Sequence, residues 1–309
     1  MVDTHTVPVN AGSPETGRLM RLASLASMAV AVTLIAAKTA AWLLTGSVSM
    51  LSSLVDSSLD LVTSIVTFFA IREALAPADA EHRFGHGKAE ALAGMAQAGF
   101  IAASAIGIGM TVINRFLYPR PVESEHVGVM VSAFGVVLTL ALMLFQGHVV
   151  RRTRSLAVHA DKTHYMADFV TNIAVGASIF LSGYFEQPLI DVGVALAVAA
   201  YMVWGAVGIG RQAIDVLMDR ELPEKDRRRI LELVRAHPGV RNVHDLRTRS
   251  AGLTKFIQLH VVFQPTMSLG RAHVMGDSVE AEIQRAFPEA EVILHIDPWN
   301  DGEPHVSPD

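Results

Sequence analysis

Long apolar runs separated by short polar segments make up the first two thirds of the chain. Each run is longer than the roughly 20 residues that an α-helix needs to cross a hydrocarbon core of about 30 Å. The pattern predicts an α-helical membrane protein with six transmembrane helices in residues 18–214, preceded by a polar, disordered tail in residues 1–17. The apolar runs cover residues 19–44, 48–76, 89–117, 127–150, 156–182 and 189–214.

After residue 214 the pattern changes, because charged residues become frequent and the apolar segments become shorter. Two segments have helical periodicity and three have the alternation or apolar content of strands. Their order, αββαβ, predicts that residues 215–309 form a small, metallochaperone-like cytoplasmic α+β domain. In such a domain the helices cover one side of an open-faced sheet. The five elements are expected in residues 223–236, 243–250, 255–263, 268–287 and 292–296.

The composition agrees with a membrane protein and excludes other classes. Hydrophobic residues make up 51% of the 309 residues, charged residues make up 18%, and the mean hydropathy is +0.37. Soluble domains carry about 25% charged residues. The formal net charge of −5 gives no reason to expect nucleic acid as a partner. Because the chain has no cysteine, thiolate metal sites and disulfides are excluded.

Lysine and arginine residues are distributed unevenly between the two ends of the predicted helices. Arg115 and Arg120 fall on one side of the membrane, and all the others near the helix ends fall on the opposite side. Since cytoplasmic segments carry the excess of basic residues, both termini are expected in the cytoplasm. The basic side contains Arg18, Arg21, Arg72, Arg83, Lys88, Arg151, Arg152, Arg154, Lys162, Arg211 and Arg220.

Two carboxylates interrupt the second apolar run. Asp56 and Asp60 are four residues apart, so they share one face of the helix, and Asp56 lies about 12 Å from the first end of the run. A charge at that depth costs on the order of 2.5–3.5 kcal/mol. A bound cation would offset that cost.

The fifth run contains a second pair with the same spacing, His164 and Asp168. Asp168 is expected about 16 Å from the cytoplasmic end, a depth that matches Asp56 and Asp60. Three carboxylates and one imidazole suit a tetrahedral divalent ion such as Zn²⁺. Two alternatives remain at this point: polar residues that bond neighbouring helices, and a proton relay without metal.

Two further groups outside the membrane have the residue types of metal sites. Asp79, His82 and His86 lie in the polar segment between the second and third runs. A solvated loop with incidental histidines is the alternative for this group. The soluble domain has its own group, for which surface histidines are the alternative. It consists of His244, His260, His273, His295 and Asp297, and His295 and Asp297 point to the same face of a strand.

With these motifs in place, the chain resembles the cation diffusion facilitator family. The likeness covers roughly residues 18–300 and includes the six spans, Asp-x3-Asp in the second, His-x3-Asp in the fifth, and the histidine-bearing αββαβ domain. Four strings carry the resemblance to one bacterial subgroup in particular. They are TGSVS at 45–49, FGHGKAE at 84–90, HDLRTR at 244–249 and FIQLH at 256–260.

The resemblance implies roles for the candidate residues. Family members are homodimers in the lipid bilayer that exchange Zn²⁺ for protons, and the subgroup belongs to the bacterial inner membrane. The implied transport site is Asp56, Asp60, His164 and Asp168, and the implied loop site is Asp79, His82 and His86. The implied two-metal cytoplasmic site is His244, His260, His273, His295 and Asp297. In the subgroup, a lysine and an aspartate equivalent to Lys88 and Asp219 pair at the dimer interface, although an ordinary solvated ion pair is the alternative.

Together these patterns predict a divalent metal exporter, not an enzyme, with Zn²⁺ as the expected cargo and a regulatory ion in the cytoplasmic domain. Fe²⁺, Cd²⁺, Co²⁺ and Mn²⁺ remain open as cargo. A membrane-bound metallohydrolase is a rival of another class, but the His-Glu-x-x-His motif of such enzymes is absent from the predicted spans. A metal sensor with an inert anchor is a second rival, and it would not need carboxylates at mid-depth.

Overall fold

The structure is a computed structural model that describes residues 14–45, 48–117, 126–185 and 189–299. The chain divides into two compact units. One contains Thr16–Ala76 and Ala89–Ile214, and the other contains Pro77–Lys88 and Asp215–Asp309. Most of the predicted tail, residues 1–13, and the end of the chain, residues 300–309, lie outside the described residues.

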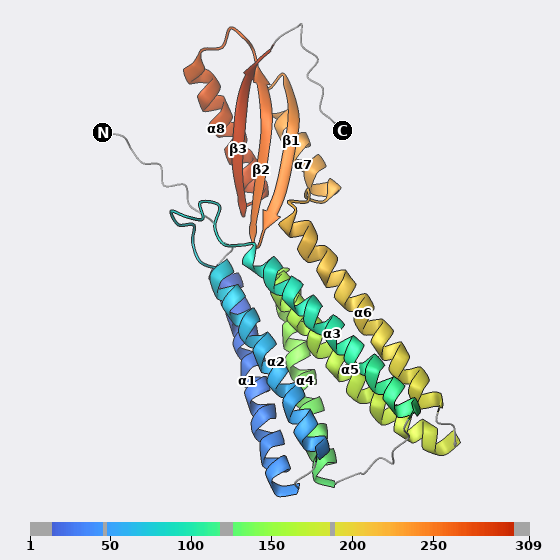
Figure 1. The fold of residues 1–309 in the computed structure, drawn as a ribbon. Coiled ribbons are helices and arrows are strands. Elements are labelled where there is room, and N and C mark those ends of the chain that lie inside the picture. Colours follow the sequence, from blue (N-terminus) through green and yellow to red (C-terminus); the bar gives the residue numbers. More distant parts are fainter. Residues whose placement is uncertain (1–13, 46–47, 118–125, 186–188, 300–309) are drawn as a thin grey trace. The chain divides into compact units, whose positions relative to one another are not determined.

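Six long helices form the first unit and confirm the predicted helical membrane domain (Figure 1). Each predicted apolar run corresponds to one helix, although the run 48–76 extends two residues beyond the end of α2 at Ala74. The helices extend a few residues beyond most runs, because backbone hydrogen bonds continue into flanking polar residues at no cost outside the hydrocarbon core. The first helix therefore begins at Pro14, within the segment expected to be a tail. The bounds are α1 Pro14–Thr45, α2 Val48–Ala74, α3 Ala89–Leu117, α4 His126–Thr153, α5 Leu156–Phe185 and α6 Leu189–Leu217.

Among the described residues, α1, α2, α3, α4 and α6 are long and apolar enough to cross a membrane. The remaining helix, α5, is of similar length but carries Asp161, Lys162, His164 and Asp168 in its first half. Large apolar side chains are exposed on the outer faces of the helices, as the 76% exposure of Trp204 illustrates. Exposed apolar surface of this kind matches a lipid environment.

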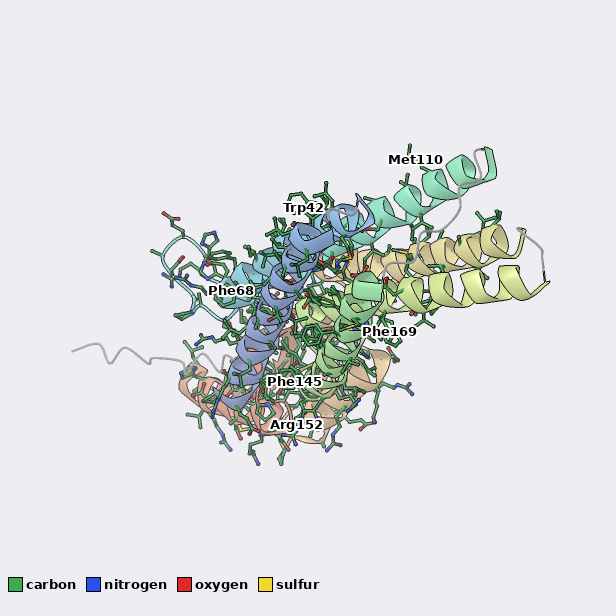
Figure 2. All side chains as sticks on the ribbon, turned by 90° about the horizontal axis from the view of Figure 1, so that it is seen from below. Trp42, Phe68, Met110, Phe145, Arg152 and Phe169 are labelled. Carbon is green, nitrogen blue, oxygen red and sulfur yellow. The ribbon has the colours of Figure 1, made fainter. Side chains whose placement is uncertain are left out.

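The polar helix α5 occupies the interior of the bundle, where it packs against α2, α3 and α4. Small residues of α3 and α5, including Ala98 and Ala160, allow close packing with α6, whose Met202 is buried there. On another side of α5, Tyr165 packs with Leu142 of α4. Seen from below, Met110 of α3 lies on the exterior of the helices (Figure 2), where its side chain is 63% exposed. The polar half of α5 is thus surrounded by other helices.

The second unit contains the predicted αββαβ domain. Its sheet has the order β1-β2-β3, with β1 and β2 antiparallel and β2 and β3 parallel. One face of the sheet packs on the two helices, where Ile257, Leu259 and Val261 join buried residues of the helices in a single core. The opposite face is left for polar side chains. The elements are α7 Glu224–Ala236, β1 Asn242–Ala251, β2 Thr254–Phe263, α8 Leu269–Ala286 and β3 Ala290–Pro298.

The segment Pro77–Lys88 belongs to the same unit and packs against the sheet. Phe84 forms an edge-to-face contact with Phe256, with 5.7 Å between ring centroids, and the Arg249 guanidinium lies over both rings. Gly87 contacts the backbone of the β1–β2 turn so closely that a Cβ atom there would lie 2.2 Å from the carbonyl oxygen of Ala251. A residue other than glycine at position 87 would therefore displace this segment.

Candidate metal centres

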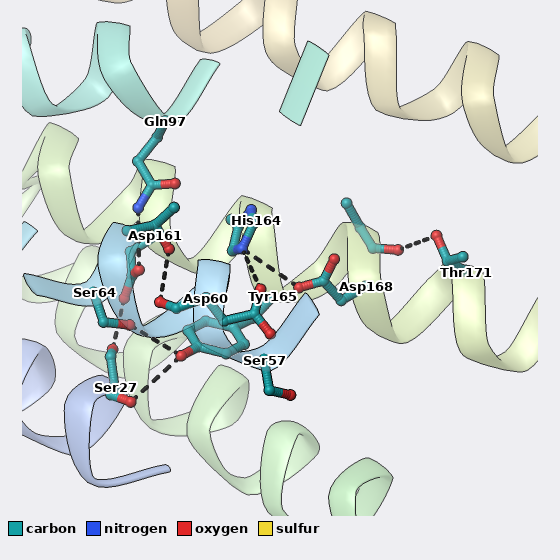
Figure 3. A network of polar contacts seen from close by, with 12 residues as sticks. Ser27, Ser57, Asp60, Ser64, Gln97, Asp161, His164, Tyr165, Asp168 and Thr171 are labelled. Atoms are coloured by element: carbon teal, nitrogen blue, oxygen red, sulfur yellow. Dashed lines mark hydrogen bonds and ion pairs between the residues drawn. The ribbon is translucent and has the colours of Figure 1, made fainter. Parts of the chain in front are cut away.

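Three of the four predicted transport ligands meet inside the helical bundle. His164 of α5 lies between two carboxylates, with its Nε2 atom 3.1 Å from Asp60 Oδ1 of α2 and 3.5 Å from Asp168 Oδ2 (Figure 3). The spacing of four residues places His164 and Asp168 one above the other on α5. The contact between α2 and α5 then brings Asp60 to them. One ligand atom from each of the three residues lies within 4.8 Å of the others.

The burial of this cluster fits an ion-binding role. The side chain of His164 is 6% exposed and that of Asp60 is 19% exposed. Asp168 Oδ2 is buried and accepts no hydrogen bond from the described residues, and His164 Nε2 lies 3.5 Å from it. A buried carboxylate oxygen without a donor is costly unless a cation approaches it. The cluster therefore offers an acceptor-rich position for a positive charge.

Asp56, the fourth predicted ligand, lies outside this three-residue cluster. It is one helical turn before Asp60 on α2, and its side chain is exposed. Ser57, the next residue, is fully buried instead. The packing of α2 thus distinguishes two carboxylates that the sequence pattern treats as equivalent.

Next to the cluster, toward the start of α5, lies a polar network that the sequence analysis did not select. The Asp161 carboxylate, 1% exposed, accepts hydrogen bonds from Ser27 Oγ at 2.6 Å and Gln146 Nε2 at 2.7 Å. Gln97 Nε2 is 3.4 Å from the same carboxylate. Asp161 of α5 is therefore linked to α1, α3 and α4 (Figure 3). The i, i+3 spacing of Asp161 and His164 was a signal available in the sequence.

The predicted loop group is also brought together. His82 Nδ1 lies 3.4 Å from Asp79 Oδ1, and His86 Nε2 lies 3.3 Å from Asp79 Oδ2. The backbone N–H groups of His82 and Glu81 donate hydrogen bonds to the Asp79 carboxylate. These two bonds lower the pKa of the exposed Asp79 carboxyl, and the bond from His82 has the larger effect. The carboxyl therefore stays ionised and able to bind a cation. The loop thus offers two imidazoles and one carboxylate.

On the open face of the sheet, three histidines form a row across the strands. His244 of β1 pairs with His260 of β2, which in turn pairs with His295 of β3. Asp297, two residues after His295 on the same face, contacts all three imidazoles: its carboxylate oxygens lie 2.8 Å from His260, 3.2 Å from His295 and 3.4 Å from His244. Nitrogen and carboxylate ligands in this arrangement fit Zn²⁺, and one carboxylate could bridge two ions.

His273, the fifth residue assigned to this group, lies apart from it. It is on α8, 74% exposed, and its Nε2 atom is 3.7 Å from Asp277. The structure instead places Asp245, which the sequence analysis missed, 3.7 Å from His260 Nε2. Asp245 adopts a φ of 48° at the irregularity in β1 between His244 and Arg247, which redirects its side chain. No simple spacing rule would have identified it.

Lys88 and Asp219 form the predicted ion pair, with Lys88 Nζ 2.9 Å from Asp219 Oδ1. Both residues lie in the second unit, and Arg249 Nη1 is 3.1 Å from the same oxygen. Burial acts to raise the pKa of the Asp219 carboxyl, but the hydrogen bonds from Lys88 and Arg249 prevail and lower it. Asp219 thus connects the segment before α3 to β1.

Comparison with known proteins gives consistent matches. Residues 24–218 match the cation efflux transmembrane domain, and residues 222–299 match the cytoplasmic domain of cation efflux proteins. The cation-efflux pump FieF of Klebsiella pneumoniae is 44% identical over 282 residues, which is 91% of this chain and 94% of the pump. FieF of Cronobacter sakazakii has the same identity and coverage. A solved structure of a protein described as a zinc transporter, CzrB, is 30% identical over 26% of this chain and 99% of its own, with a TM-score of 0.25.

Proposed function

Because the chain belongs to the cation efflux, or cation diffusion facilitator, family and is a multi-pass membrane transporter that exports divalent metal ions, we propose that it exchanges Zn²⁺ for protons. The observation that carries this proposal is the buried cluster of Asp60, His164 and Asp168. Its relatives are cation-efflux pumps, so the chain is a transporter and not an enzyme. The finer statements below concern its cargo, coupling and assembly.

We assign Zn²⁺ as cargo from the chemistry of the ligands. One imidazole and two carboxylates leave one position of a tetrahedral ion to be filled. Asp56, one turn away on α2, is the fourth ligand in this proposal and would reach the ion by a change of rotamer. The imidazole of His164 favours Zn²⁺, Cd²⁺ and Fe²⁺ over harder ions such as Mn²⁺. These other ions are alternatives with the same mechanism.

The coupling to protons follows from the same ligands. Carboxylates and imidazole bind a metal only when deprotonated, so metal and protons compete for one site. We assign His164, the imidazole among these ligands, as a carrier of the exchanged protons. A site that opens to each side of the membrane in turn then carries metal outward and protons inward. The absence of a His-Glu-x-x-His motif from the described helices argues against a metallohydrolase.

We further propose the assembly of a homodimer in a bacterial inner membrane, with both termini in the cytoplasm. In this assembly residues 18–214 form the transport domain and residues 215–309 the metal-binding and dimerisation domain. The loop residues Asp79, His82 and His86 bind an additional ion. The group of His244, His260, His295 and Asp297 binds regulatory Zn²⁺, and His273 joins these ligands only when α8 or the histidine moves. The Lys88–Asp219 pair lies at the dimer interface.

The choice of metal should depend on His164. We expect His164→Asp to lower the ratio of Zn²⁺ to Mn²⁺ transport at least about tenfold, because the site becomes all-oxygen and suits harder ions. The measurement is uptake of each ion into vesicles containing the purified protein. His159→Asp, on the same helix, is the matched control and should keep the wild-type ratio. An unchanged ratio in His164→Asp would mean that imidazole does not select the cargo.

A further inference from the structure

A lysine of α1 lies beside the proposed transport site. Lys38 Nζ donates hydrogen bonds to Ser57 Oγ at 2.6 Å and to the backbone oxygen of Ser53 at 3.1 Å. Both acceptors are on α2, and Ser57 is fully buried. Ser57 follows Asp56 directly and precedes Asp60 by three residues, so the ammonium group is anchored to the turn of α2 that carries the two carboxylates.

Lys38 is partly buried, and three carboxylates of the proposed transport site are near enough to interact with its charge. They are those of Asp60, Asp56 and Asp168. Both hydrogen-bond partners are neutral, so among the described residues the ammonium is held near these carboxylates by α2 itself. A positive charge inside a membrane domain is costly and is usually retained for a function.

We propose that Lys38 is a resident counter-charge that lowers the affinity of the transport site for divalent ions and so permits their release. This inference rests on the proposed transport site. In the empty site the ammonium offsets part of the negative charge of the carboxylates. When the metal ion enters, the ammonium repels it, so the ion is bound less tightly than it would be by the ligands alone. Lys38 is therefore a positioning charge and not a ligand.

The magnitude follows from Coulomb's law. Even at the dielectric constant of water, about 80, a unit charge roughly 6 Å away changes the affinity for a divalent ion by roughly tenfold, and a lower dielectric constant makes the change larger. The repulsion depends on the charge of the ion and not on its ligand preference. All divalent ions should therefore be affected by the same factor, whereas a distortion of the ligands would change one ion more than another.

The test measures KM and maximal rate of Zn²⁺ and Mn²⁺ uptake into vesicles for Lys38→Gln and Lys38→Arg. We expect Lys38→Gln to lower KM about tenfold for both ions and to lower the maximal rate, because release becomes slow. Lys38→Arg, which keeps the charge, should stay close to wild type. Lys162→Gln removes a charge from α5, where Nζ lies near Gly147, and serves as the matched control with an unchanged KM. If Lys38→Gln does not fold, Ser57→Ala, which removes the short contact to Nζ, should shift both KM values downward by a smaller factor.

Three results would overturn the inference: an unchanged KM in Lys38→Gln and Ser57→Ala, a shift for one ion only, or the same shift in Lys38→Arg. Asp60→Ala, assayed alongside, distinguishes a failure of the proposed role of Lys38 from a failure of the proposed transport site. If Asp60→Ala loses transport while Lys38→Gln keeps its wild-type KM, the transport site stands and the role of Lys38 is wrong. If Asp60→Ala transports normally, the transport site itself is wrong.

Discussion

Replacing Asp60 by alanine is expected to reduce Zn²⁺ transport at least about 100-fold, since even the outer partners of metal ligands typically contribute 10- to 100-fold. Asp60 is the ligand that α2 contributes to the cluster, and its Oδ1 atom is 3.1 Å from His164. Without it, the cluster keeps only His164 and Asp168, both on α5, and Asp56 is the one proposed ligand left on α2. The protein should still fold, because the change removes a partly buried charge without opening a large cavity. Uptake into vesicles and thermal unfolding are the measurements.

Glu73→Ala provides the matched control for this variant. It removes an exposed carboxylate from the last turns of the same helix, so transport should match that of wild type. Near-normal Zn²⁺ uptake by Asp60→Ala, with a folded protein, would exclude the cluster as the transport site.

The second large effect is expected in the cytoplasmic domain. Its core is made by residues of α7, α8 and the sheet alone, so a fragment of residues 215–309 should fold independently. With Zn²⁺ at about 100 times its Kd, binding stabilises the folded state by about 2.7 kcal/mol. For a domain of this size that corresponds to a rise in Tm of about 10–20 °C. Alanine at both His260 and Asp297 should remove the rise, because Asp297 contacts all three imidazoles and His260 lies between the other two.

His237→Ala is the control for the double variant. His237 follows α7 and contacts Ser278, away from the histidine row. The Zn²⁺-dependent rise in Tm should persist in this variant. A double variant that is stabilised by Zn²⁺ as strongly as the wild-type fragment would show that the histidine row does not bind the ion.

The helices and strands could be predicted well from the sequence because their causes are local. The run from residue 127 to 150 became α4, His126–Thr153, since apolar length alone decides such a segment in a membrane. The two i, i+4 pairs were likewise visible, because the helical repeat fixes which residues share a face. Strand alternation located β1 and β2 within one residue or so of their ends.

Features that depend on packing between elements could not be read from the sequence. The pattern treats Asp56 and Asp60 alike, but the contact between α2 and α5 turns one toward His164 and leaves the other exposed. Asp161 was missed because its partners lie on three other helices. Asp245 was missed because an irregularity in β1 redirects it. His273 was grouped with the histidine row by proximity in sequence, although α8 carries it elsewhere.

Exchange of Zn²⁺ for protons is the central claim, and vesicles without a membrane potential test it most directly. An imposed proton gradient between about pH 6 and 8 should drive Zn²⁺ in the opposite direction, and Zn²⁺ flow should in turn move protons, because both compete for His164 and its neighbouring carboxylates. Asp60→Ala should abolish both flows together. Zn²⁺ flux that ignores the proton gradient, with Zn²⁺ affinity unchanged across the same pH range, would contradict exchange and leave a uniporter.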